Sequence, residues 1–148
     1  NTQELLNKLL VQLFNDILHI EENSLKNIDL MDLSMTEIHT IEAVGIKDAK
    51  TMGEIAHDLR ITVGTLTTAI TKLIKKGYVE RKRIEEDRRV VLVNLTSKGE
   101  EVYKVHQVFH EEMITSMLGN FSEEEEYILA IALEKLNNFF EEKYEGIK

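Results

Sequence analysis

The sequence lacks cysteine and proline, and it lacks any apolar run long enough to cross a membrane. Without cysteine the chain forms no disulfide and has no thiol with which to sense peroxide. Without proline, its helices are expected to run uninterrupted. A membrane-spanning helix needs about 20 consecutive apolar residues, and the chain shows neither such a run nor a signal-peptide pattern. These absences favour a cytoplasmic protein that makes no use of a membrane.

The motifs of several large enzyme classes are also lacking. The 148 residues contain no glycine-rich phosphate loop, no nucleophile elbow and no HExxH zinc motif. Serine and histidine are present, but nothing in their spacing brings them together as a catalytic pair. We therefore predict that the chain is not an enzyme and that it requires no cofactor.

The net charge of −9 is distributed unevenly along the chain. Residues 50–98 carry eleven Lys and Arg against six Asp and Glu, a net charge of +5, whereas the rest of the chain carries 7 basic and 21 acidic residues, a net charge of −14. A basic segment can neutralise phosphates, while an acidic remainder is repelled by nucleic acid. The charge distribution therefore predicts one DNA-facing surface, formed by residues 50–98.

Residues 62–77 have the pattern of a helix with one apolar face and one polar face. Leu66, Ile70 and Leu73 recur at helical spacing, and Gly77 is typical of a residue that ends a helix. The opposite face is rich in threonine, a mediocre helix former whose hydroxyl and methyl groups can contact phosphates and bases. The alternative is a solvated helix face without a ligand. The residues of this helix predicted to bind DNA are Thr62, Gly64, Thr65, Thr67, Thr68, Thr71, Lys72 and Lys75.

Residues 78–95 have the pattern of a β-hairpin that follows this helix. Tyr78 to Ile84 and Val90 to Leu95 are rich in β-branched residues and are joined by a short charged segment. In that segment an acid can hold one of two guanidinium groups in position, and arginine is the side chain that narrow minor grooves attract. The alternative is a solvated tip. The predicted DNA-binding residues of the hairpin are Arg81, Asp87, Arg88 and Arg89.

With a short helix at 51–60, these elements predict a winged helix-turn-helix, in which the second helix enters the major groove. The alternative is a winged helix that contacts only other proteins. The two arginines at the hairpin tip disfavour it, because such a wing is expected to carry fewer basic residues. The overall fold class is predicted to be mainly α with a small β-wing.

The segments on either side of this core have wide apolar stripes at helical spacing, at 5–18 and at 127–140. A long helix is predicted at 98–118, and Ser122 with the acids after it is typical of a helix start. These helices can pack on their own domain, but a homodimer is favoured, because a twofold axis places two recognition helices on a palindromic operator. We predict one domain over residues 1–148, with a DNA-binding core at 33–99 and dimerisation helices at 1–32 and 100–148.

The order of these motifs resembles the MarR family of bacterial transcriptional regulators. The matching pieces are Leu33-Ser34, GTLTTAITKLIKKGYVER, the wing DRR and LTSKG. Within that family the chain is most similar to the FabT type, which represses fatty-acid synthesis genes in Gram-positive bacteria. The pieces that point there are IEE at 20–22, IHTIEAVG at 38–45, TVGTLTT at 62–68, EEDRRVV at 85–91 and HQVFHEEM at 106–113. This resemblance implies a repressor whose corepressor is a long acyl chain on acyl carrier protein.

The resemblance also implies an apolar effector pocket between the dimerisation helices and the winged domain. Plain core packing is the alternative for its residues, which are Leu18, Ile38, His39, Ile41, His106, Phe109 and His110. Because acyl carrier protein is itself acidic, it needs a local basic landing site on this acidic chain. Arg60, Lys98 and Lys104 are the candidates for that site.

Zinc is the second effector hypothesis. Zinc-responsive members of the MarR family draw their ligands from the same three helices in a similar pattern, which here falls on Glu21, His39, His106 and His110. His106 and His110 are four residues apart and share one helix face. One carboxylate and three imidazoles can form a tetrahedral site. The alternative is that these histidines are metal-free and border the acyl pocket, which the rest of the FabT-type pattern favours.

Overall fold

The computed structural model describes residues 1–26 and 32–147, and it consists of six helices and a small antiparallel sheet within those residues. The helices are α1 (Thr2–Lys26), α2 (Met35–Val44), α3 (Met52–Leu59), α4 (Val63–Lys76), α5 (Ser97–Met117) and α6 (Glu123–Ile147). The strands are β1 (Lys50–Thr51), β2 (Val79–Arg83) and β3 (Val91–Leu95). This is the predicted fold class, mainly α with a small β-wing, and that prediction is confirmed. Residues 27–31 and 148 of the predicted dimerisation segments lie outside the described residues.

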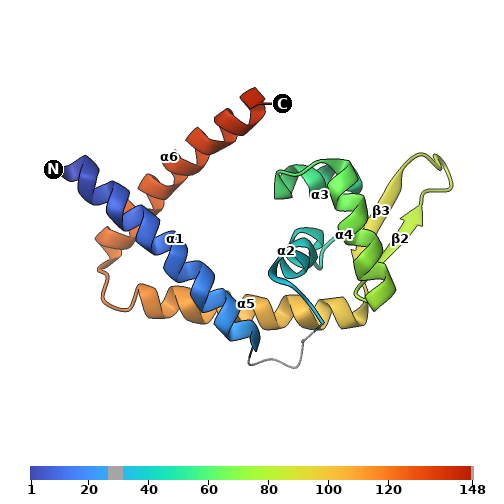
Figure 1. Ribbon diagram of the computed structural model, residues 1–148, viewed down its shortest axis with the longest axis horizontal. Coiled ribbons are helices and arrows are strands. Elements are labelled where there is room, and N and C mark those ends of the chain that lie inside the picture. The colour runs from blue at the N-terminus through green and yellow to red at the C-terminus, as the bar shows by residue number, and fades with distance from the viewer. Residues whose placement is uncertain (27–31, 148) are drawn as a thin grey trace.

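The helices divide into a winged lobe and a long framework (Figure 1). The winged lobe comprises α2, α3, α4 and the sheet, and it lies at one end of α5. The long helices α1 and α6 lie towards the other end of α5 and extend away from it. None of the helices within the described ranges is long and apolar enough to cross a membrane.

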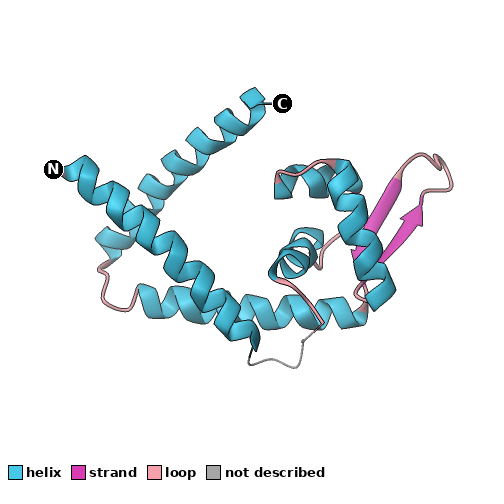
Figure 2. Ribbon diagram, in the orientation of Figure 1, coloured by secondary structure: helices cyan, strands magenta, loops and turns pink. Residues whose placement is uncertain are grey.

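The sheet has the strand order β1-β3-β2, with both pairs antiparallel. The two longer strands form the predicted hairpin, in which Val79 pairs with Leu95 and Arg83 pairs with Val91 (Figure 2). Strand β1 was not predicted from the sequence. It is only two residues long and runs directly into α3, so it is too short to show the alternating pattern that predicts a strand.

The winged lobe has its own apolar core, to which its three helices and its two longer strands contribute. The predicted apolar face of α4 is confirmed, because Leu66, Ile70 and Leu73 are completely buried. They pack in one cluster with Ile38 and Ile41 of α2 and with residues of α3, β2, β3 and α5. This core fixes the outward direction of the opposite face of α4.

Capping residues lie at the start of α2, the start of α6 and the end of α4. Ser34 begins α2 in a reciprocal capping box with Glu37, and the Ser122 hydroxyl accepts a hydrogen bond from the backbone N–H of Glu125 at the start of α6. Gly77 ends α4 with a φ of 88°, in the left-handed region that glycine adopts without steric penalty. The predicted start of α6 and the predicted end of α4 are therefore confirmed.

The junction of α4, the wing and α5 is tightly packed around Tyr78. The backbone N–H of Thr96 donates to the Tyr78 carbonyl at 3.1 Å, and the Thr96 hydroxyl donates to the Gly77 carbonyl at 2.7 Å. Gly99 of α5 lies so close that a Cβ at this position would overlap the Tyr78 carbonyl group. Because α5 starts against the last residues of α4, it is fixed to the recognition helix.

The phenol of Tyr78 is buried, and its hydroxyl donates to Asp32 Oδ1 at 2.7 Å. Burial, followed by this hydrogen bond and the nearby negative charge, raises the pKa of Tyr78 to about 12. The hydrogen bond from Tyr78 in turn lowers the pKa of Asp32.

We expect an absorbance titration of the folded protein to show a tyrosine that ionises with a pKa of about 12. The Tyr78→Phe variant should lose this component, whereas Tyr127→Phe, at a position that is 69% exposed, should not. Since the folded-state pKa is raised, the stability that this phenol contributes is complete below about pH 10 and is lost as the pH rises through about 12. A titration without a component near pH 12, or with such a component unchanged in Tyr78→Phe, would contradict the buried hydrogen bond.

Candidate nucleic-acid interface

The outer face of α4 carries the residues predicted to bind DNA. Thr62 is the N-cap of the helix, and its side chain accepts a hydrogen bond from the backbone N–H of Thr65 at 3.1 Å. The structure places all eight predicted residues of this helix on its exposed surface: Thr62, Gly64, Thr65, Thr67, Thr68, Thr71, Lys72 and Lys75. The sequence reading of one buried and one exposed face therefore agrees with the structure.

The threonine hydroxyls of this face are engaged with the helix itself. Thr67 donates to the Val63 carbonyl and Thr71 donates to the Thr67 carbonyl, each at 2.8 Å. Thr68 donates to the Gly64 carbonyl at 3.4 Å. These bonds turn the hydroxyl protons inward, which leaves methyl groups and oxygen lone pairs for an external partner.

The wing tip holds one arginine in a defined position. The guanidinium of Arg89 donates to Asp87 through Nε at 3.0 Å and through Nη2 at 3.2 Å, and the backbone N–H of Arg89 donates to the same carboxylate. These hydrogen bonds lower the pKa of Asp87, so the anchor stays ionised well into the acid range. Yet the Arg89 side chain remains 91% exposed. An ordered and accessible guanidinium is suited to enter a groove of DNA.

A shallow hollow joins α4 to the wing and contains two arginines. It has a volume of about 350 Å³ and is lined by Met52, Thr67, Arg81, Arg83 and Val91. Arg81 was predicted from the sequence, but Arg83 was not. Alternate residues of a strand share one face, so the spacing of the two arginines on β2 was the signal that could have found it.

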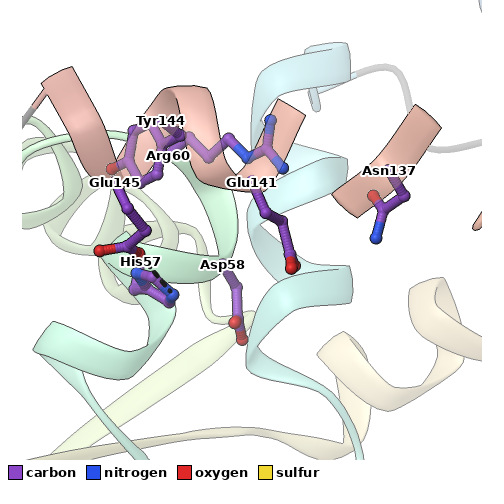
Figure 3. A pocket seen from close by; sticks show the side chains of 7 residues that line it. All are labelled: His57, Asp58, Arg60, Asn137, Glu141, Tyr144 and Glu145. Atoms are coloured by element: carbon purple, nitrogen blue, oxygen red, sulfur yellow. Dashed lines mark ion pairs between the residues drawn. The ribbon is translucent and has the colours of Figure 1, made fainter. Parts of the chain in front are cut away.

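A second hollow lies between the α3–α4 turn and the end of α6 (Figure 3). Arg60 lies in this turn with a φ of 56° and is the one non-glycine residue with positive φ in the described chain. Its guanidinium carbon is 5.5 Å from the centre of the Tyr144 ring, and His57 Nε2 is 3.6 Å from Glu145 Oε1. The hollow measures about 300 Å³ and is lined by His57, Asp58, Arg60, Asn137, Glu141, Tyr144 and Glu145.

The three residues predicted to dock acyl carrier protein do not form one patch. Arg60 shares its hollow with three carboxylates, which would repel an acidic partner. Lys98 lies in the first turn of α5, where its ammonium donates to the Lys76 carbonyl at 3.0 Å and lies 4.3 Å from the centre of the Tyr78 ring. Lys104 is exposed further along α5, so only Lys98 and Lys104 share an element.

A cluster of acids and histidines joins α1, α2 and α5. The buried Glu21 of α1 lies 3.4 Å from His110 Nε2 and 3.6 Å from His39 Nε2. His106 is 3% exposed, and its Nε2 lies 2.9 Å from both Glu42 Oε1 and His110 Nε2. The structure thus brings together all four predicted zinc ligands and adds Glu42, which sequence reasoning missed. Two sets of three among these five residues have ligand atoms within 4.8 Å of one another.

The histidines around Glu42 affect the pKa of its carboxyl group. Burial raises the pKa of Glu42, but the hydrogen bond with His106 and the charges of the three histidines outweigh it, so the pKa is lowered overall. A carboxylate that stays ionised beside imidazoles can hold either protons on the rings or a metal ion.

The predicted effector-pocket residues fall into two groups. Ile38 and Ile41 are completely buried in the core of the winged lobe, as the core-packing alternative describes. Leu18 is 50% exposed on α1, and Phe109 is half-buried and lies 5.8 Å from the His106 ring. Among the apolar candidates, only Leu18, three residues before Glu21 on α1, and Phe109, three residues after His106 on α5, therefore offer accessible surface.

A winged lobe with an exposed recognition helix, a basic wing and a long helical framework defines a class of DNA-binding regulator. The profile of the MarR family matches residues 33–91. The chain is 32% identical over 105 residues to the HTH-type transcriptional regulator BilQ of Clostridium symbiosum, covering 70% of this chain and 72% of BilQ. It is 31% identical over 111 residues to the transcriptional regulator ZitR of Lactococcus lactis subsp. cremoris, covering 73% and 76% of the two chains.

The chain belongs to the MarR family and is a DNA-binding transcriptional regulator, not an enzyme. Among solved structures, it is similar to Streptococcus pneumoniae FabT in complex with DNA, with 37% sequence identity and a TM-score of 0.89. That match covers 96% of this chain and 99% of the FabT chain. The predicted resemblance to the MarR family, and to FabT within it, is confirmed.

Proposed function

We propose that the chain acts in the cytoplasm as a homodimeric repressor of fatty-acid biosynthesis genes, with long-chain acyl-acyl carrier protein as its corepressor. The observation that carries this proposal is the extent of the similarity to FabT. It covers 96% of the chain and so includes the framework helices α1, α5 and α6, not the winged lobe alone. The FabT-type motifs at 20–22 and 106–113 lie on two of these helices, α1 and α5.

The homodimer is supported by apolar surface on α1 and α6. Phe14 is 65% exposed on α1, and Ile128 and Phe139 are 64% and 50% exposed on α6. An apolar surface that extends along two helices is typical of an interface that a partner covers. Neither helix covers the outer face of α4, whose threonines and lysines are exposed, so pairing through α1 and α6 leaves both recognition helices accessible (Figure 1). A twofold dimer of this kind reads a palindromic operator.

The acyl chain would act where the framework meets the winged lobe. Leu18 on α1 and Phe109 on α5 provide apolar surface there, and His39 of α2 connects the same region to the winged lobe. A ligand that contacts all three helices binds with different affinity to two arrangements of the winged lobe relative to the framework helices. It therefore shifts the population towards the arrangement that it binds more tightly.

Zinc is a second candidate effector, and the cluster around Glu21 and His106 is the specific observation in its favour. The donors come from α1, α2 and α5, so an ion bound there would join the same three helices. Carboxylate oxygen and imidazole nitrogen are ordinary zinc ligands. In this case the DNA-binding proposal is unchanged and only the effector differs.

Both effector proposals are tested by operator affinity on one metal-free preparation of the full chain. The duplex is one that the protein selects from random sequences. Palmitoyl-acyl carrier protein should raise the affinity by about 5- to 150-fold, the usual range of allosteric coupling. Unacylated carrier protein and Zn²⁺ should change it little. A rise with Zn²⁺ alone, abolished in His110→Ala, would replace the acyl proposal with the zinc proposal.

The docking surface is tested with a charge reversal that avoids the packed junction around Lys98. Lys104→Glu should reduce the rise in operator affinity that palmitoyl-acyl carrier protein causes, while leaving the affinity without carrier protein unchanged. Lys143→Glu on α6 is the matched control and should retain the full gain. If both effectors leave the wild-type affinity unchanged, both effector proposals are wrong and the assignment as a DNA-binding regulator stands.

A further inference from the structure

The N-terminal part of the exposed face of α4 lacks the side chains that usually read bases. Residues 62–71 are TVGTLTTAIT, with no Arg, Lys, Asn, Gln, Asp or Glu among them. Arg and Lys read guanine, Asn and Gln read adenine, and Asp and Glu read cytosine. The N-terminal part of a recognition helix is the part that meets base edges. On this part of the helix, therefore, only methyl groups, hydroxyl groups and backbone are available for direct readout.

The hydroxyl groups of three threonines are poorly disposed to donate to a base. The protons of Thr67, Thr68 and Thr71 are directed to backbone carbonyls one turn earlier in α4. Guanine presents two acceptors in the major groove and thus requires donors. An A·T pair presents the thymine methyl group and the adenine N6 donor, which match an outward methyl group and an oxygen lone pair. At these three positions the free protein is therefore complementary to A·T pairs and not to guanine.

Two further features of the same face fit close apolar contact. Val63 is 49% exposed in the first turn of α4 and adds another apolar side chain there. A Cβ at Gly64 would meet no neighbouring atom closer than 3.9 Å, so the packing of the protein does not require glycine there. Since glycine weakens a helix relative to alanine, its presence on the outer face suits close approach of the backbone to DNA.

We propose that α4 selects A·T base pairs by packing the methyl groups of Thr67, Thr68 and Thr71 against thymine methyl groups in the major groove. These threonines are then the specificity-determining residues of the interface, while Lys72 and Lys75 at the end of the helix contact phosphates. The proposal concerns the DNA-binding face alone, so it is independent of the effector.

The first test is selection of duplexes from random sequences by the full-length wild-type protein. Each half-site should contain thymine at the positions that α4 covers. Replacing one of these thymines by deoxyuridine removes a single methyl group. Burial of one such carbon is worth about a factor of four, so the affinity should fall about fourfold. Deoxyuridine in the flanks of the same duplex should have no effect. Selection of G·C pairs under α4, or equal affinity for thymine and deoxyuridine there, would overturn the proposal.

The second test separates methyl from hydroxyl groups with two matched triple variants. Substitution of Thr67, Thr68 and Thr71 by valine keeps one methyl group in place and removes the hydroxyl groups. Substitution by serine keeps the hydroxyl groups and removes the methyl groups. The valine variant should retain the preference for thymine over deoxyuridine, and the serine variant should lose it. Because all three positions are exposed, both variants should fold, which circular dichroism checks. If the serine variant instead keeps the preference for thymine and the valine variant loses it, the hydroxyl groups discriminate and the proposal is refuted.

Discussion

Replacement of Arg89 by alanine is expected to reduce operator affinity by about tenfold to a hundredfold, the range for hydrogen bonds to a charged group. Asp87 orders the guanidinium while leaving it 91% exposed, so little conformational freedom remains to be lost on binding. Fluorescence anisotropy at fixed ionic strength measures the change. Equal affinity of wild type and variant would remove the wing tip from the interface.

Two companion variants give this measurement its control. Lys143→Ala removes an exposed positive charge from α6, which is not an element of the winged lobe, and should leave operator affinity unchanged. Asp87→Asn keeps the guanidinium of Arg89 but weakens its anchor, so the affinity should fall by less than in Arg89→Ala. A loss in Asp87→Asn as large as that in Arg89→Ala would mean that the position of the guanidinium matters more than its charge.

Replacement of Gly99 by alanine is expected to destabilise the fold by about 1 to 3 kcal/mol, the usual effect of overpacking. The added methyl group would overlap the backbone carbonyl of Tyr78 and press on the Leu95 side chain. Backbone atoms cannot rotate away as a flexible side chain can, so the start of α5 must move from the wing. Urea unfolding followed by circular dichroism measures the change.

The control for this variant is Gly53→Ala in the first turn of α3. A Cβ there would meet nothing closer than Thr51 Oγ1 at 3.9 Å. Alanine is the better helix former, so this variant should be as stable as the wild type or slightly more stable. If Gly99→Ala and Gly53→Ala unfold at the same urea concentration, the close packing at Tyr78 does not contribute to stability.

Much of the winged lobe could be predicted from local sequence signals. The apolar face of α4, its end at Gly77 and the start of α6 at Ser122 depend on residues within a few positions of one another. The histidine cluster is different, because Glu42 meets His106 only once α2 and α5 pack together. Its membership depends on tertiary packing, which no local pattern encodes.

Arg60 is a residue for which the sequence suggested neighbours that the structure does not show. Its position in the sequence suggested a shared surface with Lys98 and Lys104. In the structure the left-handed turn after α3 brings Arg60 to Tyr144 of α6 instead. A residue that comes 84 positions later in the chain was thus its neighbour. Charge and spacing alone contain no information about that contact.

The length of α5 gives the molecule a mechanical property. Its 21 residues form one helix without a break, which is about 30 Å long at 1.5 Å per residue. One end is fixed to the recognition helix through Gly99 and Tyr78, and the histidine cluster lies about halfway along it. A tilt of only about 5° at one end of such a rod moves the other end by about 3 Å. In the proposed dimer the twofold axis doubles this displacement, so a shift of about 1.5 Å beside His106 would change the separation of the two recognition helices by about 6 Å.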